Sequence, residues 1–165
     1  MAAMTMGGLY VDAEGYRAMA EAAVASYPWE CCGLLVGRRG PQEVDLDGRT
    51  VVEVVALPNA WDPSRLDYTD PAGESTHSGR DRYFIDPAAM LAVQRSARQR
   101  GLEIIGVYHS HPDHPAVPSE CDRTLAWPVY SYAIISVVAG QLADLQSWRL
   151  DDQQQFQSEP VKIVP

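Results

Sequence analysis

The chain has 165 residues, of which 46% are hydrophobic and 21% charged, and it carries a formal net charge of −9 at pH 7. This length and composition fit one globular domain that buries an apolar core. The acidic balance argues against binding to nucleic acid, whose phosphates it would repel. No apolar run reaches the roughly 18 residues of a membrane span, and Met1 to Gly8 lacks the basic start of a signal peptide. With only three cysteines, we expect a cytoplasmic protein in a reducing compartment.

The first predicted element is an amphipathic helix over Val11–Ser26, which ends before Pro28. Strands are expected at about 32–37 and 50–58. The segment from Asn59 to Arg82 contains acids, prolines and glycines, and it is predicted as a long loop. Long loops in compact domains are often functional, so this loop is a candidate wall of a binding cleft.

Asp86 and Pro87 begin a second predicted helix, with the carboxylate as N-cap and the proline at the first helical position. This helix ends near Gly101. Two later strands are expected, at about 132–138 and 142–150. Together these elements predict an α/β or α+β domain over residues 1–150, with helices on a curved mixed sheet, and a polar C-terminal tail over 151–165.

The most informative segment is a buried strand over 102–108 that leads directly into the run His109-Ser110-His111-Pro112. Residues two apart on a strand point to the same face, so His109 and His111 can present two ring nitrogens to one point. Pro112 stops the strand because it has no amide hydrogen to donate. Ser110 faces the other way, and we expect it to be a bystander.

Ser119 and Asp122 follow after a proline-rich turn over 112–118, where a short helix is predicted with Ser119 as N-cap. Residues three apart on a helix are neighbours, so both side chains can face one cavity. Asp122 would then join the two histidines as a third metal ligand. Two imidazoles and a carboxylate make a hydrolytic zinc site that leaves one position for water.

Glu30 is the candidate general base. Zinc hydrolases usually take this base from a glutamate that is not a metal ligand. Glu30 lies at the mouth of the apolar strand at 32–37. A carboxylate in that position is costly unless it reaches solvent, a metal or a partner.

Each of these residues also has a simpler interpretation. Ser119 and Asp122 alone would be an N-cap and its capping-box partner, and Ser119 can serve both roles. Glu30 alone would be a solvated carboxylate at a strand end. The combined spacing favours the metal site. His77 and His114 lie in polar loops and are expected to be exposed and not to bind metal.

The same residues carry a resemblance to a known family. Glu30 with the Cys-Gly-Leu-Leu that follows, and His109-Ser110-His111-Pro112 with Ser119 and Asp122, resemble the motif of the JAMM (MPN+) metalloproteases. The best-known members are zinc isopeptidases that remove ubiquitin. The motif spans residues 30–122, and the likeness continues over most of 9–150. All five family positions are occupied, unlike in the MPN proteins that have lost their metal.

The chain is too short for the long insertions of eukaryotic deubiquitinases and is more similar to compact bacterial members, several of which act on ubiquitin-like sulfur-carrier proteins. The resemblance implies a JAMM/MPN-like fold in which His109, His111 and Asp122 hold Zn²⁺. Glu30 would take a proton from the attacking water and deliver it to the leaving amine, while Ser119 stabilises the oxyanion. The substrate implied is an extended tail that ends in a diglycine-like sequence.

Three functions stay open from the sequence. The first is the processing or deconjugation of a ubiquitin-like sulfur carrier, and the second is a peptidase on another substrate, such as a phage-tail or cell-wall peptide. The third is a non-catalytic interaction module that retains zinc. A nucleobase deaminase is disfavoured, because the chain has neither His-x-Glu at this motif nor Cys-x-x-Cys. The oligomeric state also stays open, a homodimer included.

Overall fold

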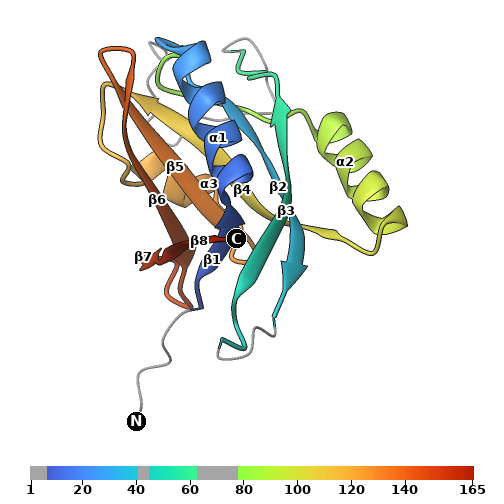
Figure 1. Ribbon diagram of the computed structural model, residues 1–165. Coiled ribbons are helices and arrows are strands. Elements are labelled where there is room, and N and C mark those ends of the chain that lie inside the picture. Colours follow the sequence, from blue (N-terminus) through green and yellow to red (C-terminus); the bar gives the residue numbers. More distant parts are fainter. Residues whose placement is uncertain (1–6, 41–44, 63–77) are drawn as a thin grey trace.

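One mixed sheet of eight strands carries the fold, in the order β7-β6-β5-β4-β2-β3-β1-β8. The computed structural model describes residues 7–40, 45–62 and 78–165 (Figure 1). The strands are β1 Leu9–Asp12, β2 Cys32–Arg39, β3 Arg49–Leu57, β4 Glu103–Pro112, β5 Ser131–Val138, β6 Gln141–Leu150, β7 Phe156–Glu159 and β8 Val161–Val164. The helices are α1 Ala13–Ser26, α2 Pro87–Gln99 and α3 Glu120–Leu125. The structure therefore confirms the α+β class with a mixed sheet.

Helices α1 and α2 pack on opposite faces of the sheet (Figure 1). Met19 and Ala23 of α1 are buried in one core cluster with Leu35 and Tyr108. The second cluster lies under α2 and includes Ala97. Both helices begin at the carboxylate N-caps that such sequences favour, Asp12 for α1 and Asp86 for α2. The sequence predicted that the first helix begins at Val11, but α1 begins at Ala13 and Leu9–Asp12 forms the short strand β1.

Strand β4 lies in the middle of the sheet and carries the two motif histidines at its C-terminal end. It pairs antiparallel with β2 and parallel with β5, so both of its edges are covered. Its residues from Ile104 to Ser110 are buried, as expected for a central apolar strand. A rigid central strand is a suitable support for side chains that must meet at one point.

The segment after Leu150, predicted as a polar tail, contributes two strands to the sheet. β7 pairs with β6, and β8 pairs with β1 at the opposite end of the strand order. Only Pro160 separates β7 from β8, and its carbonyl accepts a hydrogen bond from Leu9 N at 2.8 Å. The sheet must therefore curl until its two ends meet at this proline. Each of these edge strands has only four residues, which is too few for an apolar alternation to stand out in the sequence.

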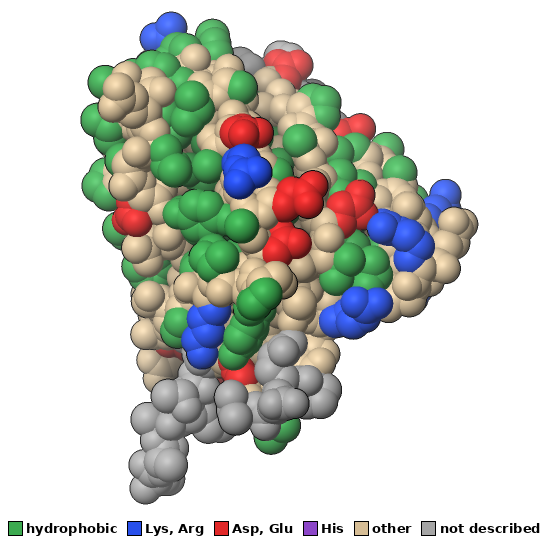
Figure 2. Space-filling model, in the orientation of Figure 1, with side chains coloured by type: hydrophobic (Ala, Val, Ile, Leu, Met, Phe, Trp, Pro, Cys, Tyr) green, Lys and Arg blue, Asp and Glu red, His purple; other side chains and the backbone are tan. Residues whose placement is uncertain are grey.

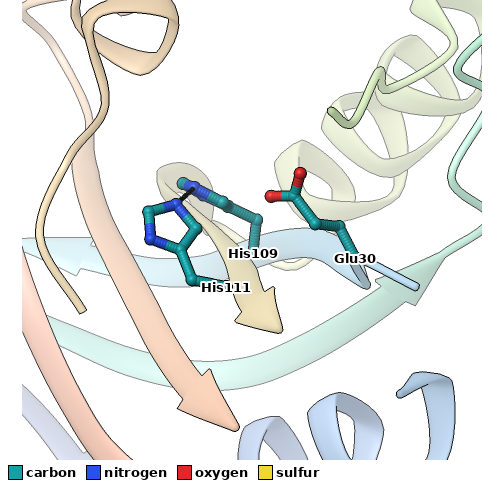
Figure 3. Close-up of side chains that lie close together, drawn as sticks. All are labelled: Glu30, His109 and His111. Carbon is teal, nitrogen blue, oxygen red and sulfur yellow. Dashed lines mark hydrogen bonds between the residues drawn. The ribbon is translucent and has the colours of Figure 1, made fainter. Parts of the chain in front are cut away.

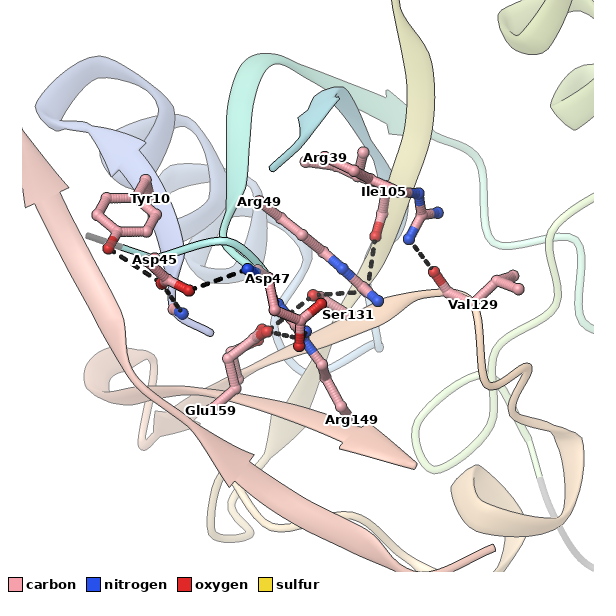
Figure 4. A network of polar contacts seen from close by, with 12 residues as sticks. Tyr10, Arg39, Asp45, Asp47, Arg49, Ile105, Val129, Ser131, Arg149 and Glu159 are labelled. Atoms are coloured by element: carbon pink, nitrogen blue, oxygen red, sulfur yellow. Dashed lines mark hydrogen bonds and ion pairs between the residues drawn. The ribbon is translucent and has the colours of Figure 1, made fainter. Parts of the chain in front are cut away.

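A buried polar network holds this closure (Figure 4). The Glu159 carboxylate accepts hydrogen bonds from Ser147 at 2.7 Å and Ser131 at 3.2 Å, and it forms an ion pair with Arg149. Glu159 and Arg149 are only 1% and 4% exposed. Arg49 donates to Ser131 at 3.0 Å and so joins the same network. Buried charges are tolerated only when they are paired in this way.

We expect Glu159→Ala to destabilise the protein by about 3 kcal/mol, the lower end of the range for a broken buried pair, because it removes the buried carboxylate partner of Arg149 and leaves only the ion pair with the exposed Asp47. Urea denaturation followed by circular dichroism measures the change. Glu120→Ala is the matched control, since it breaks an ion pair with Arg123 on the surface and should change stability little. Equal effects of the two substitutions would contradict the assigned role of the closure network.

Acidic and basic side chains are interspersed on the face of the molecule in Figure 2, so the described part of this face has no continuous basic stripe. Among the described residues, none of the helices has the length and apolar character that crossing a bilayer requires.

Candidate metal centre

Pairing between β2 and β4 brings Glu30 to the two motif histidines. The strands are antiparallel, with Cys32 opposite His109. Glu30 lies two residues before β2 begins, and His111 lies two residues beyond His109 on β4, so continuing this register brings Glu30 beside His111. Figure 3 shows both imidazole rings and the Glu30 carboxylate on the same side of the strands. Sheet register thus brings together residues that are far apart in the chain.

The two histidines and Asp122 converge on one point. His109 Nε2 and His111 Nε2 lie 3.0 Å apart. Asp122 Oδ1 lies 3.3 Å from His109 Nε2, and Asp122 Oδ2 lies 3.2 Å from His111 Nε2. The structure therefore brings together all three residues predicted as metal ligands. Two imidazole nitrogens and a carboxylate at these separations could hold one divalent cation.

The tautomer of His111 is set by a backbone carbonyl. His111 Nδ1 lies 2.8 Å from Pro115 O, which can only accept a hydrogen bond. Nδ1 therefore carries a ring hydrogen, and Nε2 is the ring nitrogen that faces Asp122 and His109. This is the arrangement by which metal-binding histidines are usually oriented. The proline-rich turn after β4 thus helps to prepare a ligand.

His109 is fully buried and stacks on Tyr83, with ring centroids 4.4 Å apart and an interplanar angle of 22°. Burial lowers the pKa of His109, against the attraction of the Asp122 carboxylate. Its ring therefore favours the neutral form that a metal ligand needs. Nothing in the sequence pointed to Tyr83, because the stacking depends on a contact between distant segments.

Ser119 and Asp122 form the predicted capping box at the start of α3. Ser119 Oγ accepts a hydrogen bond from Asp122 N at 3.1 Å, and Asp122 Oδ2 accepts one from Ser119 N at 2.8 Å. Burial opposes the ionisation of Asp122, but the two imidazoles hold its pKa well below its usual range. The box fixes the carboxylate in the orientation in which it meets both histidines. Ser119 uses only the acceptor side of its hydroxyl here, which leaves its own hydrogen for a ligand.

The Glu30 carboxylate is buried and incompletely hydrogen-bonded. Glu30 is 4% exposed, and its Oε2 has no hydrogen-bond partner among the described residues. Glu30, His109 and His111 each place one ligand atom within 4.8 Å of the others. Burial, together with the nearby Asp122 carboxylate, raises the pKa of Glu30 well above its ordinary value. An orphaned oxygen in this position fits a site built for a cation and a water molecule.

Ser110 is not the bystander that the sequence suggested. It is fully buried, and its Oγ accepts a hydrogen bond from Cys31 N at 2.8 Å. The Ser110 amide in turn donates to Cys31 O at 3.2 Å. These two bonds hold the residue that follows Glu30 against β4. The prediction was wrong because the partner of Ser110 lies 79 residues away in the chain.

His114 is exposed, as predicted, whereas His77 lies outside the described residues. Two hollows adjoin the site and share Glu30, Asp122, Asp81 and Arg82 as walls. The first, of about 280 Å³, is largely apolar and is also lined by Tyr83, Phe84, Ile85, Met90, Val107, Cys121, Leu125, Trp127, Tyr130 and Tyr132.

The second hollow, of about 360 Å³, is also lined by His111, His114, Pro115, Val117 and Ser119. The described end of the loop over 59–82 therefore forms a cleft wall, as the sequence predicted, and the proline-rich turn forms another. The site lies between an apolar hollow and a more polar one.

Fold and site together define a domain of the JAMM/MPN type. Residues 12–151 match the family described as prokaryotic homologs of the JAB domain. The chain belongs to this family, and the resemblance seen in the motif is confirmed.

Individual relatives agree with this assignment. The chain is 32% identical to a desampylase of Haloferax volcanii over 117 residues. This matched region covers 70% of this chain and 68% of the relative. It is 34% identical over 103 residues to a probable TtuB-protein conjugate cleaving protease of Thermus thermophilus, covering 62% of this chain and 53% of that protein. A solution structure of a protein from Desulfitobacterium hafniense is similar with a TM-score of 0.72 and 26% identity, over 94% of this chain and 92% of that one.

Proposed function

We propose that this chain is a zinc-dependent isopeptidase that hydrolyses the amide bond after a diglycine-like tail of a ubiquitin-like sulfur-carrier protein. The observation that carries the proposal is the meeting of two imidazoles, the Asp122 carboxylate and the orphaned Glu30 carboxylate at one buried point. Relatives named a desampylase and a conjugate-cleaving protease support the substrate class.

His109, His111 and Asp122 are the proposed metal ligands. Asp122 lies within 3.3 Å of both Nε2 atoms, whereas Glu30 Oε2 has no partner at hydrogen-bond distance among the described residues. Asp122 is therefore the carboxylate closer to the two histidines and is assigned as the ligand. Glu30 is assigned to the water molecule rather than to the metal. Zinc held there would supply a Lewis acid for the amide carbonyl and lower the pKa of water toward ~7.

Glu30 is the proposed general base. Its raised pKa suits a carboxylate that must take a proton from the attacking water and later give it up. The same oxygen can deliver that proton to the leaving amine, which restores the carboxylate for the next cycle. Hydrogen bonds from the segments around it hold the Glu30 backbone, so the carboxylate can reach the reacting atoms without a large rearrangement.

Ser119 is the proposed oxyanion donor. Its hydroxyl lines the polar hollow and keeps its hydrogen free while Oγ caps α3. A hydrogen bond to an oxyanion that strengthens in the transition state contributes about 3 kcal/mol in other hydrolases.

The two hollows give the substrate an entry on each side of the site. We propose that a tail that ends in glycine lies between them, beside the four residues that line both hollows. We propose a cytoplasmic location, and the lack of any disulfide at Cys31, Cys32 and Cys121 in the described structure agrees with a reducing compartment.

Incubation with a sulfur-carrier protein extended beyond its Gly-Gly should release the residues after the second glycine. Mass spectrometry of the product identifies the bond, and a chelator should stop the reaction. Replacing the penultimate glycine by valine should lower kcat/KM by about 100-fold, as expected when a reacting group is displaced by roughly 1 Å. Changing the residue after the second glycine should matter less.

Other outcomes of this experiment would favour the other candidates. Binding by zinc-loaded protein without cleavage would point to an interaction module. Cleavage that is indifferent to the glycine would point to a general peptidase.

A further inference from the structure

Asn59 connects three segments that meet behind the site. Its Nδ2 donates hydrogen bonds to Glu30 O at 3.2 Å and Arg82 O at 3.0 Å. Its Oδ1 accepts from Trp61 N at 3.0 Å and Phe84 N at 3.1 Å. Both donor hydrogens and both acceptor positions of the amide are therefore used. Asparagine supplies two donors and two acceptors on a short stem, and no smaller side chain can replace it.

These four bonds control two parts of the candidate site. Glu30 is tied through its carbonyl to Asn59 and through its amide to Gly79 O at 2.8 Å. Tyr83, which stacks on His109, lies between the two residues of its segment that bond to Asn59. One amide thus fixes the backbone of the proposed base and the segment whose ring packs behind a proposed ligand.

Asn59 contributes to neither hollow, so a substrate there would meet Glu30 and Tyr83 but not Asn59. We infer that Asn59 is the positioning residue for Glu30, holding its backbone so that the carboxylate stays within reach of the attacking water. The inference rests on the proposed function in its assignment of Glu30 as base. A reacting group displaced by roughly 1 Å can cost about 100-fold in rate.

Amide hydrogen exchange tests the positioning without any substrate. In Asn59→Ala, the amides of Glu30, Trp61 and Phe84 should exchange about tenfold faster, because their local opening becomes easier. Amides of β4 should be unchanged. Asn59→Ser, which puts one hydroxyl in place of the amide, replaces the alanine variant if that variant does not fold. Unchanged exchange at Glu30 would overturn the inference, whether or not the protein cleaves a tail.

Kinetics separate positioning from a general structural role. Asn59→Ala should lower kcat by about 100-fold while KM and zinc content stay near those of the wild type. In the Glu30→Gln background, the same substitution should lower the residual rate no further, because the side chain that Asn59 positions can no longer take a proton. An equal loss in both backgrounds, or an unchanged kcat, would overturn the inference.

Asp45→Ala is the matched control. Asp45 accepts hydrogen bonds from Gly8 N, Tyr10 and Asp47 N, and it lies before the start of β3, whereas Asn59 follows the end of that strand. Its loss should lower stability and leave kcat unchanged. The two experiments can fail separately. If the wild-type protein cleaves no tail but hydrogen exchange changes as expected in Asn59→Ala, the proposed function is wrong and the contacts assigned to Asn59 are right.

Discussion

Glu30→Gln should retain one zinc ion per chain and lose cleavage by about 10²–10⁴-fold, the usual contribution of a general base. The substitution keeps the size of the side chain but removes its ability to take a proton. It leaves His109, His111 and Asp122 untouched. Elemental analysis measures the metal, and the rate of release of the tail residues measures the activity.

Glu14→Gln is the control for this substitution, because Glu14 lies in the first turn of α1 and forms no part of the site. This control substitution should leave the zinc content and the cleavage rate unchanged. If Glu30→Gln turned over substrate normally, another residue would have to be the base. If it lost the metal, Glu30 would have to be counted among the ligands.

His109→Ala and Asp122→Ala should each lose most of the bound zinc, since each removes one of three converging ligands. The wild type should hold close to one zinc ion per chain. Zinc at 100 times its Kd should also stabilise the wild type against unfolding by about 2.7 kcal/mol, and the variants by much less. Thermal unfolding with and without zinc measures this difference.

His114→Ala is the matched control, because His114 lies in the turn between β4 and α3 and lines the second hollow together with Asp122, but it is exposed and outside the ligand cluster. It should keep the full metal content and the full thermal shift. If His109→Ala and Asp122→Ala kept the zinc content of the wild type, the assignment of these residues as ligands would be wrong.

The sequence was sufficient for the parts of the site that depend on local geometry. The period of a strand relates His109 to His111, and one helical turn relates Ser119 to Asp122, so spacing alone predicts that each pair shares a face. The caps of α2 and α3 were equally predictable, because an N-cap is a contact within a few residues.

The parts that the sequence did not reveal depend on pairing between distant segments. Ser110 holds Cys31 across 79 residues, and Asn59 reaches Glu30 across 29. Tyr83 reaches His109 only because the segment before α2 folds back over β4. Hydrophobic periodicity describes one element at a time and carries no information about which elements become neighbours.

The placement of β7 and β8 also bears on how the protein behaves at high concentration. Unpaired strand edges can template pairing between molecules, and native proteins keep such edges short. Here β8 covers the outer side of β1 along all four of its residues, whereas β7 covers β6 only at Ser147–Leu150. Both covering strands have four residues and are joined through Pro160. The outermost strands of the described sheet are thus only four residues long, and we expect this C-terminal segment to limit pairing with a neighbouring molecule along the edges that it covers.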